Sequence, residues 1–249
     1  RGELKVGKRA AGDTGIVLGR RFGFLTVVAT RPNSPARKAG IKAGDYIKFI
    51  DGKHTHNITV VKGERLLEGE PGTTVKVAIF KSGTDAVETP VVRERPSASL
   101  PVSRLLEGGV GYIAVSDLGD GVAGTLKASI ASLQAQGAGA LVLDLRSSAT
   151  GPLKNAVALA ELFVKGGVVT KVASRNAPEQ TLVASDAARA WSGPLAVLVD
   201  RGTAGAAEIA AACLADSDRA SLFGENTFGR AGIQKQIPLE SGGGLLLTV

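Results

Sequence analysis

The chain has 249 residues, of which 44% are apolar and 21% charged, and its net charge is +7. This composition is typical of a folded protein, the length allows two domains, and no apolar run reaches the roughly 18 residues that a membrane-spanning helix needs. A single cysteine excludes an internal disulfide. The two histidines have no carboxylate or cysteine partner, so the sequence predicts no metal site, and we expect no cofactor. An aromatic content of 4% argues against a surface on which nucleic-acid bases stack.

The positive charge is concentrated at the N-terminal end. Residues 1–53 contain twelve Lys and Arg against four Asp and Glu, a net charge of +8, so the rest of the chain sums to −1. Such a segment attracts nucleic acid, anionic lipid or a peptide carboxylate. A solvated basic face is the simpler interpretation, and we expect no nucleic-acid partner.

Residues 12–95 follow a short N-terminal segment, 1–11, and contain an ordered series of helix-cap and turn signals. Ser34 is suited to cap a short helix, Pro35 to its first turn and Gly40 to its end. The series S-P-A-x-x-A-G followed by G-D-x-I resembles the PDZ domains associated with bacterial proteases. This resemblance implies a small, mainly-β domain that binds the C-terminal tail of a peptide or protein as an added strand.

The peptide-binding residues are assigned by this resemblance. In such domains, a short segment of glycine and apolar residues holds the terminal carboxylate of the peptide in a nest of backbone N–H groups. The best match here is the run Thr14, Gly15, Ile16, Val17 and Leu18.

Strand-like runs alternate with helical patterns in the second half of the chain. Apolar runs of strand type occupy residues 110–115, 140–145 and 195–199, and the segments between them have helical periodicity. This alternation predicts an α/β core with a mainly parallel sheet, in which ligands bind at the carboxyl ends of the strands. The proline-containing stretch 96–109 is expected to be a linker. We expect the core to cover residues 110–249 and to lack its C-terminal part.

Three motifs at the ends of these strands carry the most specific signal. They are D-L-R at 144–146, A-A-E-I at 206–209 and T-F-G at 227–229. Together they resemble the C-terminal processing (tail-specific) peptidases, which have a crotonase-like core and a serine/lysine dyad. The resemblance implies an exported protein of the periplasm or cell envelope.

The dyad itself is missing from this alignment. The nucleophilic serine of the family falls on Gly205 and the general-base lysine on Arg230, whereas the family's glutamine is present as Gln234. Glycine has no hydroxyl, and the pKa of arginine is too high for it to act as a base. We therefore expect no intact catalytic residue.

The oxyanion positions of the family fall on Thr150, Gly151 and Ala206. Thr150 replaces the first glycine of the family's G-G pair, and Pro152, after the second, has no N–H to donate. The N–H of Ala206 at a helix N-terminus is expected to remain. Glu208 in the first turn of that helix complements its dipole and is expected to be structural.

Three functions stay open at this point. The leading hypothesis is a pseudoprotease that binds C-terminal tails through its PDZ domain, as a scaffold or regulator of an active relative or in a homo-oligomer. An active peptidase with an unusual catalytic set would need Ser147, Ser148 or Thr203 as nucleophile, without a lysine or histidine at 228–234 to activate it. A carrier of small apolar ligands, a function of eye retinoid-binding proteins that resemble this core, would need an apolar pocket near Gly205.

Overall fold

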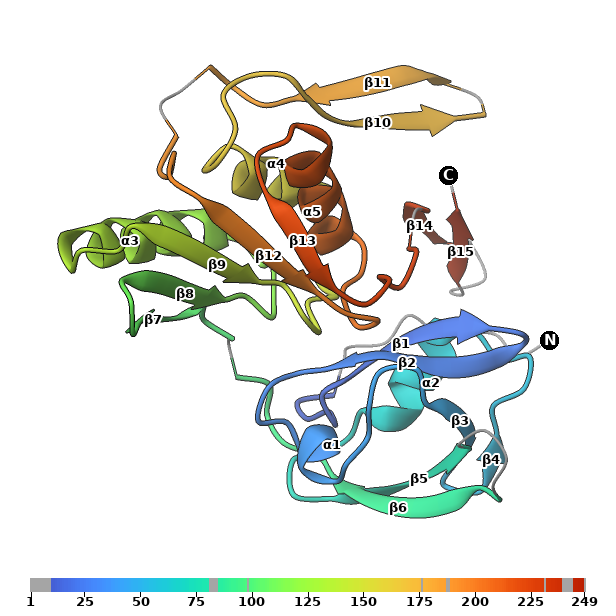
Figure 1. Ribbon diagram of the computed structural model, residues 1–249. Coiled ribbons are helices and arrows are strands. Elements are labelled where there is room, and N and C mark those ends of the chain that lie inside the picture. Colours follow the sequence, from blue (N-terminus) through green and yellow to red (C-terminus); the bar gives the residue numbers. More distant parts are fainter. Residues whose placement is uncertain are drawn as a thin grey trace. The chain divides into compact units, whose positions relative to one another are not determined.

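A computed structural model describes residues 10–80, 85–97, 99–175, 177–186, 189–230, 232–238 and 244–248. Contacts divide the chain into two compact units, residues 1–97 together with 231–249, and residues 98–230 (Figure 1). No helix among the described residues is long and apolar enough to cross a membrane.

The first unit is an antiparallel sheet with two helices (Figure 1). Its elements are β1 (Ile16–Arg21), β2 (Phe24–Thr30), α1 (Pro35–Lys38), β3 (Tyr46–Ile50), β4 (Lys53–His54), α2 (Val60–Leu67), β5 (Thr74–Phe80) and β6 (Val87–Val92). The strands pair in the order β1-β2-β3-β5-β6, and β4 pairs with β3. Strand β1 is therefore at an edge of the sheet.

Local signals account for the short helix of this unit. The side chain of Ser34 accepts a hydrogen bond of 3.3 Å from the N–H of Arg37, and Pro35 occupies the first turn. Gly40 follows the helix with a φ of 78°. The predicted cap, first turn and stop of this helix are all confirmed.

The turn between β1 and β2 contains an unusual residue. Arg21 pairs with Phe24, so Phe22 and Gly23 form a two-residue turn, with φ angles of 49° and 81°. Two positive φ values are typical of a type I′ turn, in which Asn-Gly is favoured. A large side chain in this conformation costs about 1 kcal/mol, and the Phe22 side chain is 86% exposed and gains little from packing.

Replacing Phe22 by asparagine is therefore expected to stabilise the protein. The Phe22→Asn variant keeps the turn, relieves the backbone strain and should raise the free energy of unfolding by about 0.5–1 kcal/mol. Urea denaturation followed by circular dichroism measures this change. A lower stability of the variant would show that the exposed ring makes a stabilising contact within the chain.

The second unit begins with a hairpin and continues as alternating strands and helices. Its elements are β7 (Val102–Leu106), β8 (Val110–Ala114), α3 (Val122–Ala135), β9 (Ala140–Asp144), α4 (Leu153–Ala160), β10 (Val168–Ser174), β11 (Ala177–Val183), β12 (Leu195–Val199), α5 (Ala206–Asp216) and β13 (Ser221–Gly224). The main sheet has the order β13-β12-β9-β8-β7, and all its neighbours are parallel except β7 and β8. The prediction of a mainly parallel α/β core beside a mainly-β domain is confirmed.

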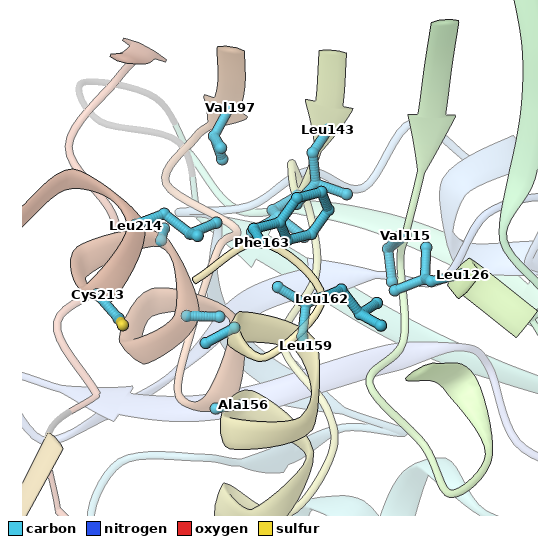
Figure 2. Packing of buried hydrophobic residues seen from close by; sticks show 14 of the residues in the cluster. Val115, Leu126, Leu143, Ala156, Leu159, Leu162, Phe163, Val197, Cys213 and Leu214 are labelled. Carbon is cyan, nitrogen blue, oxygen red and sulfur yellow. The ribbon is translucent and has the colours of Figure 1, made fainter. Parts of the chain in front are cut away.

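The core of the second unit lies between the sheet and its helices. Figure 2 shows Leu143 of β9 and Val197 of β12 meeting Leu159 of α4 and Leu214 of α5 around the ring of Phe163. These side chains are fully buried, with relative exposures of 0%. Their packing holds α4 and α5 against strands β9 and β12 of the sheet.

The predicted linker over 96–109 differs from the structure. Residues 102–106 form strand β7, which pairs antiparallel with β8 at the edge of the main sheet. Most side chains of this edge strand are exposed, so its sequence lacks the alternation of apolar and polar residues that indicates a strand. The proline and glycines on either side of it then resemble those of a linker. At the C-terminal end, β14 (Gln234–Pro238) and β15 (Gly244–Thr248) form a separate antiparallel hairpin.

Candidate functional site

Gly205 forms a sharp turn between β12 and α5. The strand ends at Val199, and the helix begins at Ala206 with Gly205 as its N-cap residue. Gly205 has φ 62° and ψ −117°, a combination that other residues adopt only under strain. Strained strand-to-helix turns of this kind expose a nucleophile at the top of the sheet in hydrolases. Position 205 thus lies at the carboxyl end of a parallel strand, where the sequence predicts a ligand site.

Position 205 has room for a side chain. Apart from chain neighbours, the described atom nearest to a Cβ added there is Cδ of Arg230, at 3.8 Å. The backbone at position 205 therefore has the conformation of a turn that carries a nucleophile, whereas the glycine at this position has no hydroxyl.

Arg230 lies half-buried beside this turn. Its Nη1 donates a long hydrogen bond of 3.5 Å to the carbonyl of Ala149, in the loop after β9. Its guanidinium carbon is 5.7 Å from the centre of the Phe228 ring. The side chain thus extends from its own loop toward the loop after β9, with a charged group that cannot take up a proton.

Glu208 joins the Gly205 turn to the loop that carries Arg230. Its Oε2 accepts hydrogen bonds from the N–H of Gly205 at 2.7 Å and the N–H of Arg230 at 2.9 Å. Its Oε1 accepts from the N–H of Gly229 at 2.6 Å. The sequence predicts only a helix-dipole role, and the structure adds a clamp of three backbone hydrogen bonds. The spacing of a capping box, from residue 205 to residue 208, could have indicated the hydrogen bond to Gly205. It could not have indicated the other two partners of Glu208, which lie 21 and 22 residues further along the chain.

The predicted oxyanion residues lie on two loops that are joined to each other. The N–H of Ala204 donates a hydrogen bond of 2.8 Å to the carbonyl of Ser148. Ala206 begins α5, so its N–H belongs to the free N–H groups at the positive end of the helix dipole. The loop with Thr150 and Gly151 continues directly from Ser148.

This second loop is packed against the segment before α3. Gly151 has φ 110°, and a Cβ there would lie 2.2 Å from the carbonyl oxygen of Leu118, so only glycine fits. Thr150 uses its hydroxyl in a hydrogen bond of 2.6 Å to Oδ1 of Asp117. Pro152 is the N-cap residue of α4. The glycine of this loop is thus required by packing, whereas the neighbouring position accommodates threonine.

The three hydroxyls considered as substitute nucleophiles have structural roles or no access. Ser148 and Thr203 are 0% exposed. Thr203 donates a hydrogen bond of 2.9 Å to the carbonyl of Leu145. Ser147 contacts Oδ2 of Asp200 through its hydroxyl at 3.3 Å, and its N–H binds Oδ1 at 2.8 Å. These contacts position the loops and supply no amine or imidazole to activate a nucleophile.

A charged cluster fixes the start of the loop after β9. The carboxylate of Asp144 accepts hydrogen bonds from the hydroxyl of Tyr112 at 2.7 Å and from Nη2 of Arg146 at 2.6 Å. Burial alone would raise the pKa of Asp144, but the hydrogen bonds from Arg146 and Tyr112 outweigh it and the net pKa is lowered. The carboxylate is therefore ionised at neutral pH and serves as an anchor. No group of three or more His, Cys, Asp and Glu that could hold a metal ion occurs among the described residues.

The predicted peptide-binding run, Thr14 to Leu18, leads into the edge strand β1. Among the described strands, β1 pairs with β2 alone. Helix α2 packs against β1, and a Cβ at its Gly63 would lie 2.9 Å from Cδ1 of Leu18 and 2.3 Å from Cδ1 of Leu25. The glycine thus lets the helix lie close to the strand. Addition of a peptide strand occurs at an edge strand of a sheet, and β1 has this place among the described strands.

Local contacts hold the start of this run. Gly15 has φ 80°, and a Cβ there would lie 2.2 Å from Cβ of Ser34, so glycine is required. The N–H of Gly15 donates a hydrogen bond of 2.8 Å to Oδ1 of Asp13, which also pairs with Arg31. Gln234 is the first residue of β14 and belongs to the first unit.

Comparison with protein-family models gives two matches. A model of peptidase family S41 matches residues 109–249, more than half of the chain. A PDZ-domain model matches residues 26–79, within the segment that resembles this domain in its sequence.

Individual proteins of similar sequence or structure are named as C-terminal processing peptidases or proteases. The chain is 34% identical over 234 residues to a chloroplast carboxyl-terminal-processing peptidase 2 of Arabidopsis thaliana, a match covering 90% of this chain and 45% of the relative. It is 32% identical over 228 residues to the carboxy-terminal processing protease CtpA of Bacillus subtilis, covering 91% of this chain and 49% of the relative. The solved structure of a photosystem II D1 C-terminal processing protease matches with a TM-score of 0.87 at 27% identity, covering 96% of this chain and 66% of that one. The chain spans about half the length of these curated relatives.

Proposed function

The chain belongs to peptidase family S41, and we propose that it is a pseudoprotease that binds C-terminal tails without cleaving them. The tails bind through the PDZ domain. The protease-like unit acts as a scaffold or as a regulator of an active relative. We further propose an exported protein, in keeping with relatives that are named as bacterial and chloroplast processing proteases.

The geometry at Gly205 carries this proposal. The turn at this position has the backbone of a nucleophile-bearing turn, yet its residue has no side chain. Arg230 occupies the position from which an amine would act as the base, with its Cδ 3.8 Å from an added Cβ at 205. A Ser/Lys mechanism needs a hydroxyl and an amine that can be neutral, and both are absent from these two positions. The buried or structurally bonded hydroxyls nearby support the same conclusion.

Tail binding rests on a different part of the chain. The edge strand β1 begins at Ile16, directly after the glycine that the PDZ resemblance places in the carboxylate-binding segment. A tail that pairs with β1 gains main-chain hydrogen bonds, and its terminal carboxylate gains charge-assisted bonds from backbone N–H groups.

Incubation of the whole chain with an unfolded protein that ends in apolar residues tests the loss of activity. We expect no cleavage and no covalent labelling by a fluorophosphonate, a reagent that modifies activated serines. The Bacillus subtilis relative serves as the positive control. Cleavage that the fluorophosphonate blocks would overturn the proposal and favour a peptidase with an unusual catalytic set.

Calorimetric titration tests tail binding. Peptides with an apolar C-terminal residue and a free carboxylate are expected to bind, and the same peptides with a C-terminal amide to bind about tenfold or more weakly, because the amide lacks the charge. Equal affinity for both forms, or no binding of either, would contradict recognition of C-termini.

A further inference from the structure

The aromatic residues of the first unit lie outside its core. Between residues 10 and 97 the sequence has five Phe and Tyr residues. The buried cluster of this unit consists of Leu, Ile, Val and Ala side chains. The five aromatic residues are Phe22, Phe24, Tyr46, Phe49 and Phe80, and all are half-buried or exposed. Because aromatic side chains bury more apolar area than any others, this distribution points to a surface that contacts something outside the chain.

Four of these residues surround one hollow. Phe22, Phe24, Tyr46 and Phe80, together with Lys48, line a hollow of about 420 Å³. Strand pairing brings them to one end of the sheet, since Tyr46 pairs with Phe80 across β3 and β5. Phe22 lies in the two-residue turn of the adjacent β1–β2 hairpin.

The turn of this hairpin exposes an aromatic ring at a position where turns of this type favour asparagine or glycine. Phe22 is 86% exposed and Phe80 is 40% exposed. Phe22 also has a φ of 49°, at a position where asparagine or glycine would fit without strain. Neither burial nor turn geometry therefore accounts for a phenylalanine here, and strained residues of this kind concentrate at functional sites.

Cations flank this aromatic surface. Arg20 and Arg21 precede Phe22 directly and are exposed, and Lys48 is part of the wall of the hollow. The two arginines and Lys48 belong to the segment 1–53, with its net charge of +8. No acidic side chain is among the described residues that line the hollow.

We propose that the hairpin tip and the hollow form a docking surface for an anionic lipid bilayer, a function beyond tail binding. Exposed aromatic rings enter the interfacial region of a bilayer, and nearby Arg and Lys side chains are attracted to anionic headgroups. A protruding Phe22 with two adjacent arginines fits this interface. A protein partner would have to present an acidic surface with an apolar side chain that fills the hollow.

Co-sedimentation of the whole chain with lipid vesicles tests the proposal. We expect binding to vesicles that contain equal parts of phosphatidylglycerol and phosphatidylcholine at low salt, and little binding to phosphatidylcholine alone. The double variant Phe22→Asn, Phe80→Ser should bind at least about tenfold more weakly, because two aromatic groups no longer enter the interface. Phe223→Ser is the matched control, since Phe223 is 55% exposed but lies on β13 of the other unit. Its binding should equal that of the unaltered chain.

Fluorescence of a Phe22→Trp variant locates the contact. The natural Trp191 is 4% exposed, so a vesicle-dependent shift reports on position 22. We expect a blue shift with vesicles containing phosphatidylglycerol and none with phosphatidylcholine alone. Absence of binding to the anionic vesicles would overturn the proposal and leave the hollow to a protein partner. Undiminished binding of the double variant, or no spectral shift at position 22, would equally rule out this surface as the contact.

Discussion

Replacement of Gly205 by serine and of Arg230 by lysine in the same molecule is expected to create a reactive serine that neither change creates alone. Labelling by a fluorophosphonate, followed by intact mass spectrometry, measures the result. The double variant should react at least about 100-fold faster than Gly205→Ser alone, because a positioned general base contributes about 10²–10⁴-fold. The unaltered chain and Arg230→Lys alone have no hydroxyl at position 205 and should not react there.

The expectation rests on the geometry of the turn. A Cβ added at position 205 lies 3.8 Å from Cδ of Arg230. Lysine has the same carbon stem up to this atom, and its amine follows two bonds later, within reach of a serine hydroxyl. The adjacent N–H of Ala206 at the start of α5 is placed to stabilise negative charge that develops on the reagent.

The serine is also expected to cost stability. A residue with a side chain at φ 62° and ψ −117° is strained, so Gly205→Ser should lower the free energy of unfolding by about 1–3 kcal/mol. The matched control is Gly205→Ala with Arg230→Lys, which carries the same strain without a hydroxyl and should not be labelled.

Two outcomes would contradict this argument. Labelling of Gly205→Ser as fast as that of the double variant would mean that another group acts as the base. A folded double variant that stays unlabelled would mean that the site has lost more than its two side chains, and the loop with Thr150 would then be the first segment to change. Its hydroxyl is bonded to Asp117 at 2.6 Å.

The parts of the structure that the sequence predicts well are those specified by neighbouring residues. The helix from Pro35 ends and begins as its cap residues indicate. Asp51 and Gly52, a residue pair that favours tight turns, have positive φ values of 46° and 72°. The position of Gly205 at a strand end follows from the alternation of strands and helices. In each case the conformation is set by residues only a few positions apart.

The features that sequence reasoning missed depend on distant contacts or on exposure. Strand β7 has mostly exposed side chains and is defined by its pairing with β8. The conformation of Phe22 follows from the hairpin register, and nothing in a phenylalanine suggests a left-handed turn. Packing of Gly151 against Leu118 joins residues that no local pattern connects. A sequence pattern reflects the conformational preference of each residue. The conformation at these positions is determined instead by the residues that contact them in the folded protein.

Removal of the Glu208 carboxylate is expected to have the largest effect on the stability of the site. Glu208→Ala deprives the N–H groups of Gly205, Gly229 and Arg230 of their acceptor. Charge-assisted hydrogen bonds of this kind contribute more than neutral ones, so the free energy of unfolding should fall by about 2–4 kcal/mol. Urea denaturation measures the loss, and hydrogen exchange at these three amides should become faster.

A surface glutamate provides the control. Glu225 pairs with Arg201 at 3.1 Å, and both side chains are exposed, so Glu225→Ala should change stability by less than about 1 kcal/mol. If Glu208→Ala were as stable as this control and its three amides exchanged no faster, the clamp would contribute nothing to the fold of the site.

The three hydrogen bonds of Glu208 also hold together the two positions of the missing dyad. Glu208 binds the backbone of both positions at which the dyad residues would stand, Gly205 and Arg230. Adding Glu208→Ala to the Gly205→Ser, Arg230→Lys variant should therefore remove most of its labelling, because the introduced amine would no longer be held beside the serine. Undiminished labelling of this triple variant would mean that the loop keeps its place without the carboxylate. Loss of labelling with a retained fold would show that the framework for a dyad persists in a chain that has lost the dyad itself.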